Sequence, residues 1–158
     1  MDKSAIVREK LKIAQWVQSL STLSDELWFK AFHEGSWGTA DVIAHFISWD
    51  RFMMEHRITY VLNDEPPPQH PIDVHAINQA ASHYARSGIS KHELIAAFIS
   101  VRQQIVSLIE AIPNDKFPLP LPGKESLTLT AYLESMIQHD LNHQEQITRF
   151  MEMHTVDT

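Results

Sequence analysis

Apolar side chains recur at intervals of three and four residues along most of the chain, and prolines interrupt the pattern at only a few places. Such spacing places the apolar side chains on one face of an α-helix. The segments with this pattern are about 3–21, 39–63, 91–112 and 128–153, with shorter ones at 25–32 and 74–86. Only 4 glycines occur among 158 residues, which argues against turn-rich β folds. The sequence therefore predicts an all-α fold, a four-helix bundle with one or two short accessory helices, in a single domain spanning residues 1–158.

The helix ends are marked by polar residues and prolines. Thr39 is expected to be the N-cap of the second long helix, because its hydroxyl can accept a backbone N–H. The prolines at 66–68 end that helix. The proline-rich residues 113–125 are expected to form an extended connection. Residues 127–130 alternate in polarity but have no evident partner strand, so we expect no β-sheet.

Charge and composition exclude several classes of protein. The formal net charge of −7 disfavours binding to nucleic acid or to an anionic membrane. With no cysteine, the chain has no disulfide, thiolate metal ligand or cysteine nucleophile. Glu-x-x-His di-iron motifs, nucleotide-binding glycine loops and the Gly-x-Ser-x-Gly motif are also missing. No apolar run approaches 18 residues and no secretory signal is evident, so we expect a cytoplasmic protein.

Histidine is unusually frequent, with 10 residues. Seven of them have no second ligand in register and are expected to be solvated or packed on the surface: His33, His56, His70, His75, His83, His92 and His154. The other three differ. His139 and His143 lie four residues apart on one helix, on the same face as apolar neighbours, and His45 lies on the inward face of another helix.

Three neutral imidazoles that point into one bundle can share a divalent metal ion, and three histidines with an open fourth position are typical of catalytic zinc sites. The alternative is that His45, His139 and His143 are separate core histidines, each with its own hydrogen bond. Asp140 is a candidate to orient a ligand imidazole, since a carboxylate often accepts the second ring N–H. Its alternative is a solvated or salt-bridged surface position.

Two tryptophans are candidates for substrate contact. Trp37 lies in the break before the second long helix, where it could pack on the helix start or line the mouth of a site near His45. Trp49 lies on the inward stripe of that helix, where a core position is the alternative.

The segments Gly-Ser-Trp-Gly-Thr-Ala-Asp-Val-Ile-Ala-His (35–45) and His-Asp-Leu-Asn-His-Gln-Glu-Gln-Ile (139–147) resemble the two histidine motifs of the DinB-like superfamily. The proline-rich connection and residues 112–115 agree with this resemblance. It implies a four-helix bundle in which His45, His139 and His143 bind a divalent metal, commonly zinc or nickel. It further implies a thiol S-transferase that uses a low-molecular-weight thiol, or a metal-dependent hydrolase, and often a homodimer.

The leading hypothesis is thus a metal-dependent enzyme acting on a small molecule, either a thiol S-transferase or a hydrolase. Two other classes remain open. One is a non-catalytic binding or resistance protein with a pocket inside the bundle. The other is a bundle in which the metal only stabilises the fold.

Overall fold

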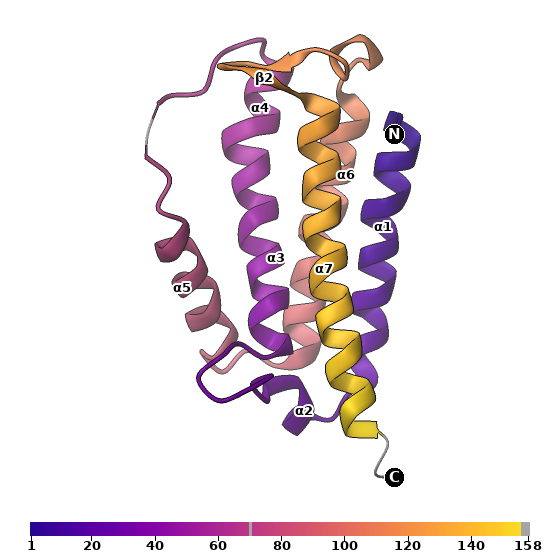
Figure 1. Ribbon diagram of the computed structural model, residues 1–158, viewed down its shortest axis with the longest axis vertical. Coiled ribbons are helices and arrows are strands. Elements are labelled where there is room, and N and C mark those ends of the chain that lie inside the picture. Colours follow the sequence, from indigo (N-terminus) through magenta and orange to yellow (C-terminus); the bar gives the residue numbers. More distant parts are fainter. Residues whose placement is uncertain (70, 156–158) are drawn as a thin grey trace.

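Four long helices lie side by side in the computed structural model, which describes residues 1–69 and 71–155 (Figure 1). They are α1 (Lys3–Ser19), α3 (Thr39–Met53), α6 (Lys91–Ala111) and α7 (Leu129–Thr155). The shorter helices are α2 (Asp25–Phe29), α4 (Thr59–Leu62) and α5 (Val74–Ala85), with 3-10 turns at Leu20–Thr22 and Asn114–Lys116. The predicted four-helix bundle with short accessory helices is confirmed. His70 and residues 156–158 lie outside the described residues.

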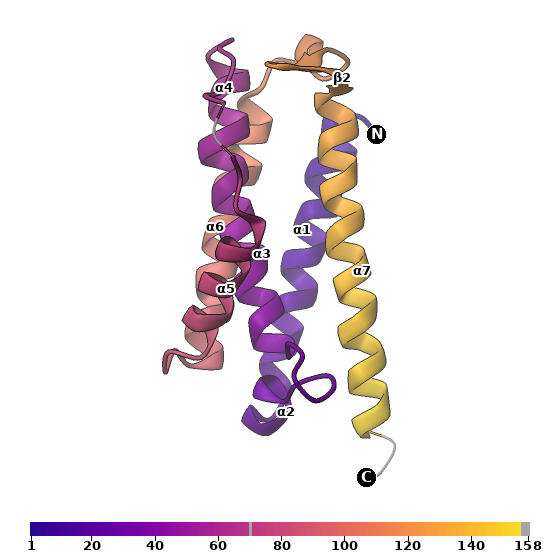
Figure 2. The same ribbon diagram turned by 60° about the vertical axis from the view of Figure 1, so that its left-hand side comes forward.

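The long helices form two parallel pairs. Helices α1 and α7 run in one direction, and α3 and α6 run in the other (Figures 1 and 2). After α4 the chain therefore runs back along the length of the bundle, through a proline-rich connection and α5, before α6 begins. Helix α5 packs on α3. Helix α6 is apolar and long enough to cross a membrane by length and composition alone, and here it packs against α1 and α3. The backbones of α3 and α7 approach each other closely at few positions, which leaves room for side chains between the two helices.

Helix α3 continues into α4 through a π-helical turn at Met54–Ile58, so the second long helix extends from Thr39 to Leu62. The Thr59 hydroxyl donates to the Met54 carbonyl at 2.6 Å, which satisfies an acceptor in this wider turn. A π turn adds one residue to the helix and shifts the direction of the side chains after it.

A short antiparallel hairpin covers one end of the bundle. It pairs β1 (Pro120–Leu121) with β2 (Lys124–Thr128), so the expectations of no sheet and of an extended connection through 113–125 are wrong here. Gly123 has a φ of 81°, a conformation that permits the tight turn. Leu121 is buried, and the hairpin therefore places an apolar side chain on the end of the core.

The N-cap of α3 is Gly38 rather than Thr39, which is the first helical residue. The carboxylate of Asp41 reaches back and accepts the Gly38 N–H at 2.8 Å, which fixes the start of the helix one residue earlier. A Cβ at Gly38 would lie 2.3 Å from the Lys30 carbonyl oxygen, so this position has no room for a side chain.

A layer of buried charged residues divides the apolar core in two. Lys10, Asp50, Arg102 and Asp140 come one from each long helix, and each is at most 4% exposed. One apolar cluster contains residues on one side of this layer, such as Ile13 and the α3 segment before Asp50. The other contains Ile6 and the residues beyond it towards the hairpin.

Candidate metal centre

The three histidines singled out in the sequence come together between α3 and α7. One ring nitrogen from each of His45, His139 and His143 lies within 4.8 Å of the other two. The Nε2 atoms of His45 and His139 are 2.9 Å apart. The ring centroids of the three pairs are separated by 4.7 to 5.1 Å. Among the described residues, this is the one group of three or more potential ligands so arranged.

Helix geometry explains the convergence. His139 and His143 lie one turn apart on α7, so both imidazoles project from the same face towards α3. His45 projects from α3 and is 6% exposed, while the His139 side chain remains 34% exposed. The ring of Phe46 packs against His139 and His143 from the core side. The cluster is thus closed by apolar packing on one side and reachable from solvent on the other.

Asn78 on α5 fixes the protonation of His45. Its Oδ1 accepts a hydrogen bond from Trp49 Nε1 at 2.8 Å and lies 3.0 Å from His45 Nδ1. Because the indole N–H can only donate, this Asn78 atom must be an oxygen, and His45 Nδ1 therefore carries the proton. The Nε2 atom of His45 is left with a free lone pair, directed at the other two histidines.

Oxygen acceptors hold the other two imidazoles in the same way. His139 Nδ1 lies 3.2 Å from Asp140 Oδ1, and His143 Nδ1 lies 3.2 Å from Gln146 Oε1. Burial is the largest single influence on the pKa of the Asp140 carboxyl, and it raises that pKa. Arg102 and the hydrogen bond from His139 together outweigh burial, so the pKa of Asp140 is lowered and the carboxylate form is favoured. The carboxylate accepts the His139 Nδ1 proton, and Nε2 of His139 becomes a free acceptor.

These hydrogen bonds make the cluster suitable for a cation. Two imidazole lone pairs, those of His45 and His139, face each other at 2.9 Å and cannot form a hydrogen bond while both rings are neutral. A shared divalent ion resolves this conflict, since the nitrogen ligands of a tetrahedral zinc ion lie about 3.4 Å apart. The donor set, three neutral nitrogens with oxygen-bound second nitrogens, fits a borderline-soft divalent metal.

Burial favours the neutral form of two of the three imidazoles, those of His45 and His143. Burial, followed by the neighbouring His139 and His143, lowers the pKa of His45 to about 4. Burial and then His139 also lower the pKa of His143. Because only the neutral imidazole binds a metal, these shifts reduce the competition from protons.

Asp140 is itself held by the buried charged layer. Arg102 donates to Asp50 through Nε at 2.7 Å and through a second nitrogen at 3.2 Å, and it lies 3.0 Å from Asp140 Oδ2. That Asp140 oxygen forms an ion pair with Arg102, but it accepts no well-aligned hydrogen bond from the part of the chain that the structure describes. Lys10 completes the layer with a buried amine that has no hydrogen-bond partner among the described residues, and burial lowers its pKa. A continuous path of contacts thus runs from Asp50 through Arg102 and Asp140 to His139.

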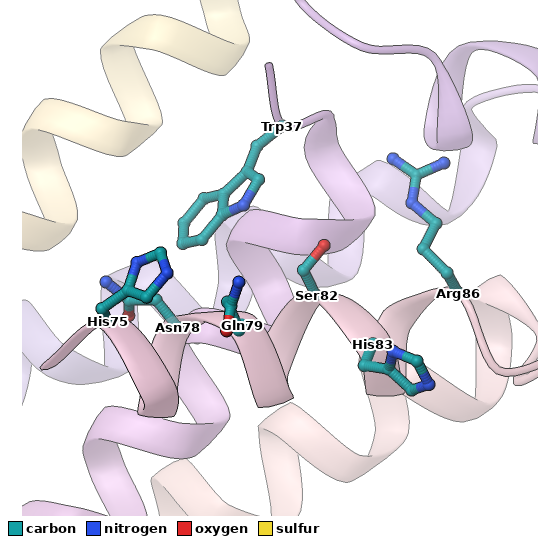
Figure 3. Close-up of a pocket in the computed structure, with 7 residues that line it drawn as sticks. All are labelled: Trp37, His75, Asn78, Gln79, Ser82, His83 and Arg86. Atoms are coloured by element: carbon teal, nitrogen blue, oxygen red, sulfur yellow. The ribbon is translucent and has the colours of Figure 1, made fainter. Parts of the chain in front are cut away.

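A cavity of about 630 Å³ opens beside the cluster, between Trp37 and α5 (Figure 3). Two of its lining residues touch His45: the Trp37 ring lies 5.0 Å from the imidazole centroid, and Asn78 accepts its Nδ1–H. Trp37 therefore lies beside His45 and lines this cavity. Trp49 also packs near His45, with ring centroids 6.3 Å apart, but it does not line this cavity.

Three participants were missed in the sequence: Asn78, Asp50 and Arg102. No sequence motif pointed to Asn78, because its partners His45 and Trp49 lie 33 and 29 residues away on another helix. Asp50 and Arg102 each occupy an inward position of an otherwise apolar stripe, which was an available signal of a buried ion pair. The surface alternative for Asp140 is wrong, since Asp140 is 4% exposed.

The remaining described histidines do not join the cluster. His75 and His83 line the cavity beside Trp37, and His56 lines a second cavity near the hairpin. His92 is exposed, and His154 contacts the Phe150 carbonyl.

Comparison with known proteins adds two findings. Residues 11–147 match the sequence model of the DinB superfamily. The structure is similar to that of YfiT from Bacillus subtilis, described as a probable metal-dependent hydrolase with an unusual four-helix bundle topology. The TM-score is 0.73 at 16% sequence identity, over 96% of this chain and 86% of YfiT, which shows a common fold. No curated protein sequence matches this chain significantly.

Proposed function

The chain belongs to the DinB superfamily, and from this premise we propose that it is a metal-dependent enzyme of the hydrolase type acting on a small molecule. One observation carries the proposal: His45 and His139 direct unprotonated Nε2 atoms at each other, and His143 lies beside them. The description of YfiT as a probable metal-dependent hydrolase supports the same reaction class.

The three histidines would hold the ion, with zinc or nickel as the proposed metals. A divalent ion bound there supplies a Lewis acid and lowers the pKa of a water or thiol towards neutrality. Among the described residues the cluster offers three ligands, so an ion held there would have a position open to solvent or substrate.

The surrounding residues position and shield the site. Asn78 and Asp140 hold the His45 and His139 rings in one tautomer and orientation. Phe46 excludes water from the core side, and Trp37 lines the neighbouring cavity. The cavity of about 630 Å³ is in the size range of small-molecule sites, so we propose a small-molecule substrate.

The first test is the metal content of untagged protein, measured by mass spectrometry after equilibration with zinc and nickel. We expect about one metal ion per chain in the wild type and a loss in His143→Ala. His92→Ala is the matched control, because it removes an exposed imidazole outside the cluster, and it should retain the metal. A wild-type protein without stoichiometric metal would overturn the proposal.

Turnover then separates the reaction types. Cleavage of an activated ester without added thiol supports a hydrolase. Thiol-dependent conversion of chlorodinitrobenzene supports a thiol S-transferase, for which the same three histidines would hold the metal. In either case His143→Ala should abolish turnover and His92→Ala should not.

A further inference from the structure

A second cavity lies at the hairpin end of the molecule, away from the histidine cluster. It has a volume of about 840 Å³ and is formed by three segments distant in sequence: the π turn with α4, the proline-rich connection with the start of α5, and the hairpin turn. Trp49 separates it from His45: its indole donates to Asn78, and its ring packs 5.1 Å from that of Phe52, which lines the cavity.

The cavity walls are largely rigid and apolar. Five prolines line it: Pro66, Pro67, Pro68, Pro71 and Pro122. The fixed φ of proline limits the freedom that these walls could lose when a ligand binds. The hairpin turn also packs on the connection, since a Cβ on Gly123 would lie 3.5 Å from Pro67 Cδ. A preformed, mostly apolar cavity of this size is typical of a small-molecule site.

Aromatic and cationic side chains in and beside the π turn line this cavity. Phe52 precedes the turn, Arg57 lies within it and Tyr60 follows it, and all three line the wall. The Arg57 guanidinium lies 5.0 Å from the centroid of the Phe52 ring. Such π turns frequently occur at functional sites because they change where side chains point.

The charge of the cavity is opposite to that of the protein. Arg57 and Lys124 both line it, and in the described part of the chain neither forms an ion pair with a carboxylate. The acidic lining residue, Asp73, is engaged as the N-cap of α5, where it accepts the Ala76 N–H. Two cations without carboxylate partners in a chain of net charge −7 favour an anionic ligand here.

We propose that this cavity binds a small organic anion with a flat apolar body, such as an aryl carboxylate or sulfonate. The rings of Phe52 and Tyr60 contact the body of the ligand, and Arg57 and Lys124 bind its anionic group. The site is distinct from the histidine cluster and does not depend on a bound metal.

The probe is 8-anilinonaphthalene-1-sulfonate, whose fluorescence rises in apolar surroundings, and its uncharged partner is N-phenyl-1-naphthylamine. We expect saturable binding of one sulfonate probe per wild-type chain. The double variant Arg57→Met/Lys124→Met should weaken sulfonate binding by about tenfold or more, because charge-assisted hydrogen bonds are lost. Binding of the uncharged probe should change by less than about threefold. Phe52→Leu should weaken both probes, since it removes a ring that both contact.

Two controls isolate the cavity. Lys12→Met/Arg149→Met removes the same positive charge from exposed pairs elsewhere and should leave binding unchanged. His143→Ala should also leave it unchanged. Lys124→Met alone, at the exposed first residue of β2, should weaken sulfonate binding to a smaller extent and serves as the test if the double variant unfolds. The proposal is overturned if wild-type binding is not saturable, if neither cavity variant weakens sulfonate binding more than the control, or if His143→Ala abolishes it.

Discussion

At the scale of single residues, the candidate site is defined by which ring nitrogen of each histidine carries a proton. Asn78 and Asp140 accept the Nδ1 protons of His45 and His139, so the Nε2 atoms are left as acceptors that face each other. Asn78 and Asp140 can influence metal affinity without contacting the ion, because each fixes the tautomer and the orientation of a ligand imidazole.

Asn78 therefore offers a test of tautomer control. Asn78→Ala removes the acceptor for both His45 and Trp49, and we expect zinc affinity to fall by about 10- to 100-fold. Asn78→Asp keeps an oxygen at this position and should retain most of the affinity. Zinc titration against a competing chelator measures both variants. Equal losses in the two would show that the acceptor oxygen has no role.

The lowered pKa of His45 predicts how the metal-free protein responds to pH. The unfolded chain takes up a proton at this residue near pH 6.5, and the folded chain only near pH 4. Stability from neutral His45 is therefore present above about pH 6.5 and is lost as the pH falls towards 4, by up to about 3 kcal/mol.

Urea unfolding of metal-free wild type and His45→Gln at pH 7 and pH 4.5 measures this effect. The wild type should lose more stability between these two pH values than the variant, in which the titrating group is gone. A pH dependence that is the same in both proteins would contradict the assigned shift.

At the scale of elements, the charged layer joins all four long helices at one level of the core. Arg102 on α6 lies between Asp50 on α3 and Asp140 on α7, and its guanidinium also lies 3.4 Å from the Lys10 carbonyl on α1. The same arginine thus connects the packing of the bundle to the carboxylate that holds His139.

Arg102→Met should destabilise the protein by about 3–5 kcal/mol, because it leaves two buried carboxylates without their cation. Adding Asp50→Asn to this variant removes one of those charges and should restore part of the loss. Urea denaturation midpoints measure both. If Asp50→Asn lowers the stability of the Arg102→Met variant further, the charge of Arg102 does not stabilise the buried carboxylates.

At the scale of the whole molecule, the candidate metal site links the two antiparallel halves of the bundle. Its ligands come from α3 and α7, which otherwise pack loosely, so a bound ion would stabilise the folded state relative to the unfolded chain. At a free zinc concentration of about 100 times Kd, this stabilisation is about 2.7 kcal/mol.

We therefore expect a chelator to lower the Tm of the zinc-loaded wild type by several degrees. The Tm of His143→Ala should not respond to either zinc or chelator, whereas that of His92→Ala should follow the wild type. Differential scanning calorimetry checks this. A wild-type Tm that is independent of zinc would contradict a bound ion at this site.

The sequence by itself determined the helices and the three histidines. Helical spacing of apolar residues is a local property, and His139 and His143 share a face because of the helix repeat alone. Those features could be predicted since they depend on residues within a few positions of each other. His45 was also visible locally, from its place on an inward stripe, and the motif resemblance pointed to the same residue.

Only the tertiary structure decided the partners of these residues. Asn78 meets His45 because the proline-rich connection brings α5 back along α3. Arg102 on α6 meets Asp140 on α7 because both helices pack on α1 and α3, and the two side chains reach each other at one level of the core. The hairpin likewise required the turn at Gly123 to bring its strands together. Contacts between distant segments depend on how helices pack against each other, and a periodic pattern in one helix carries no information about the register of its neighbour.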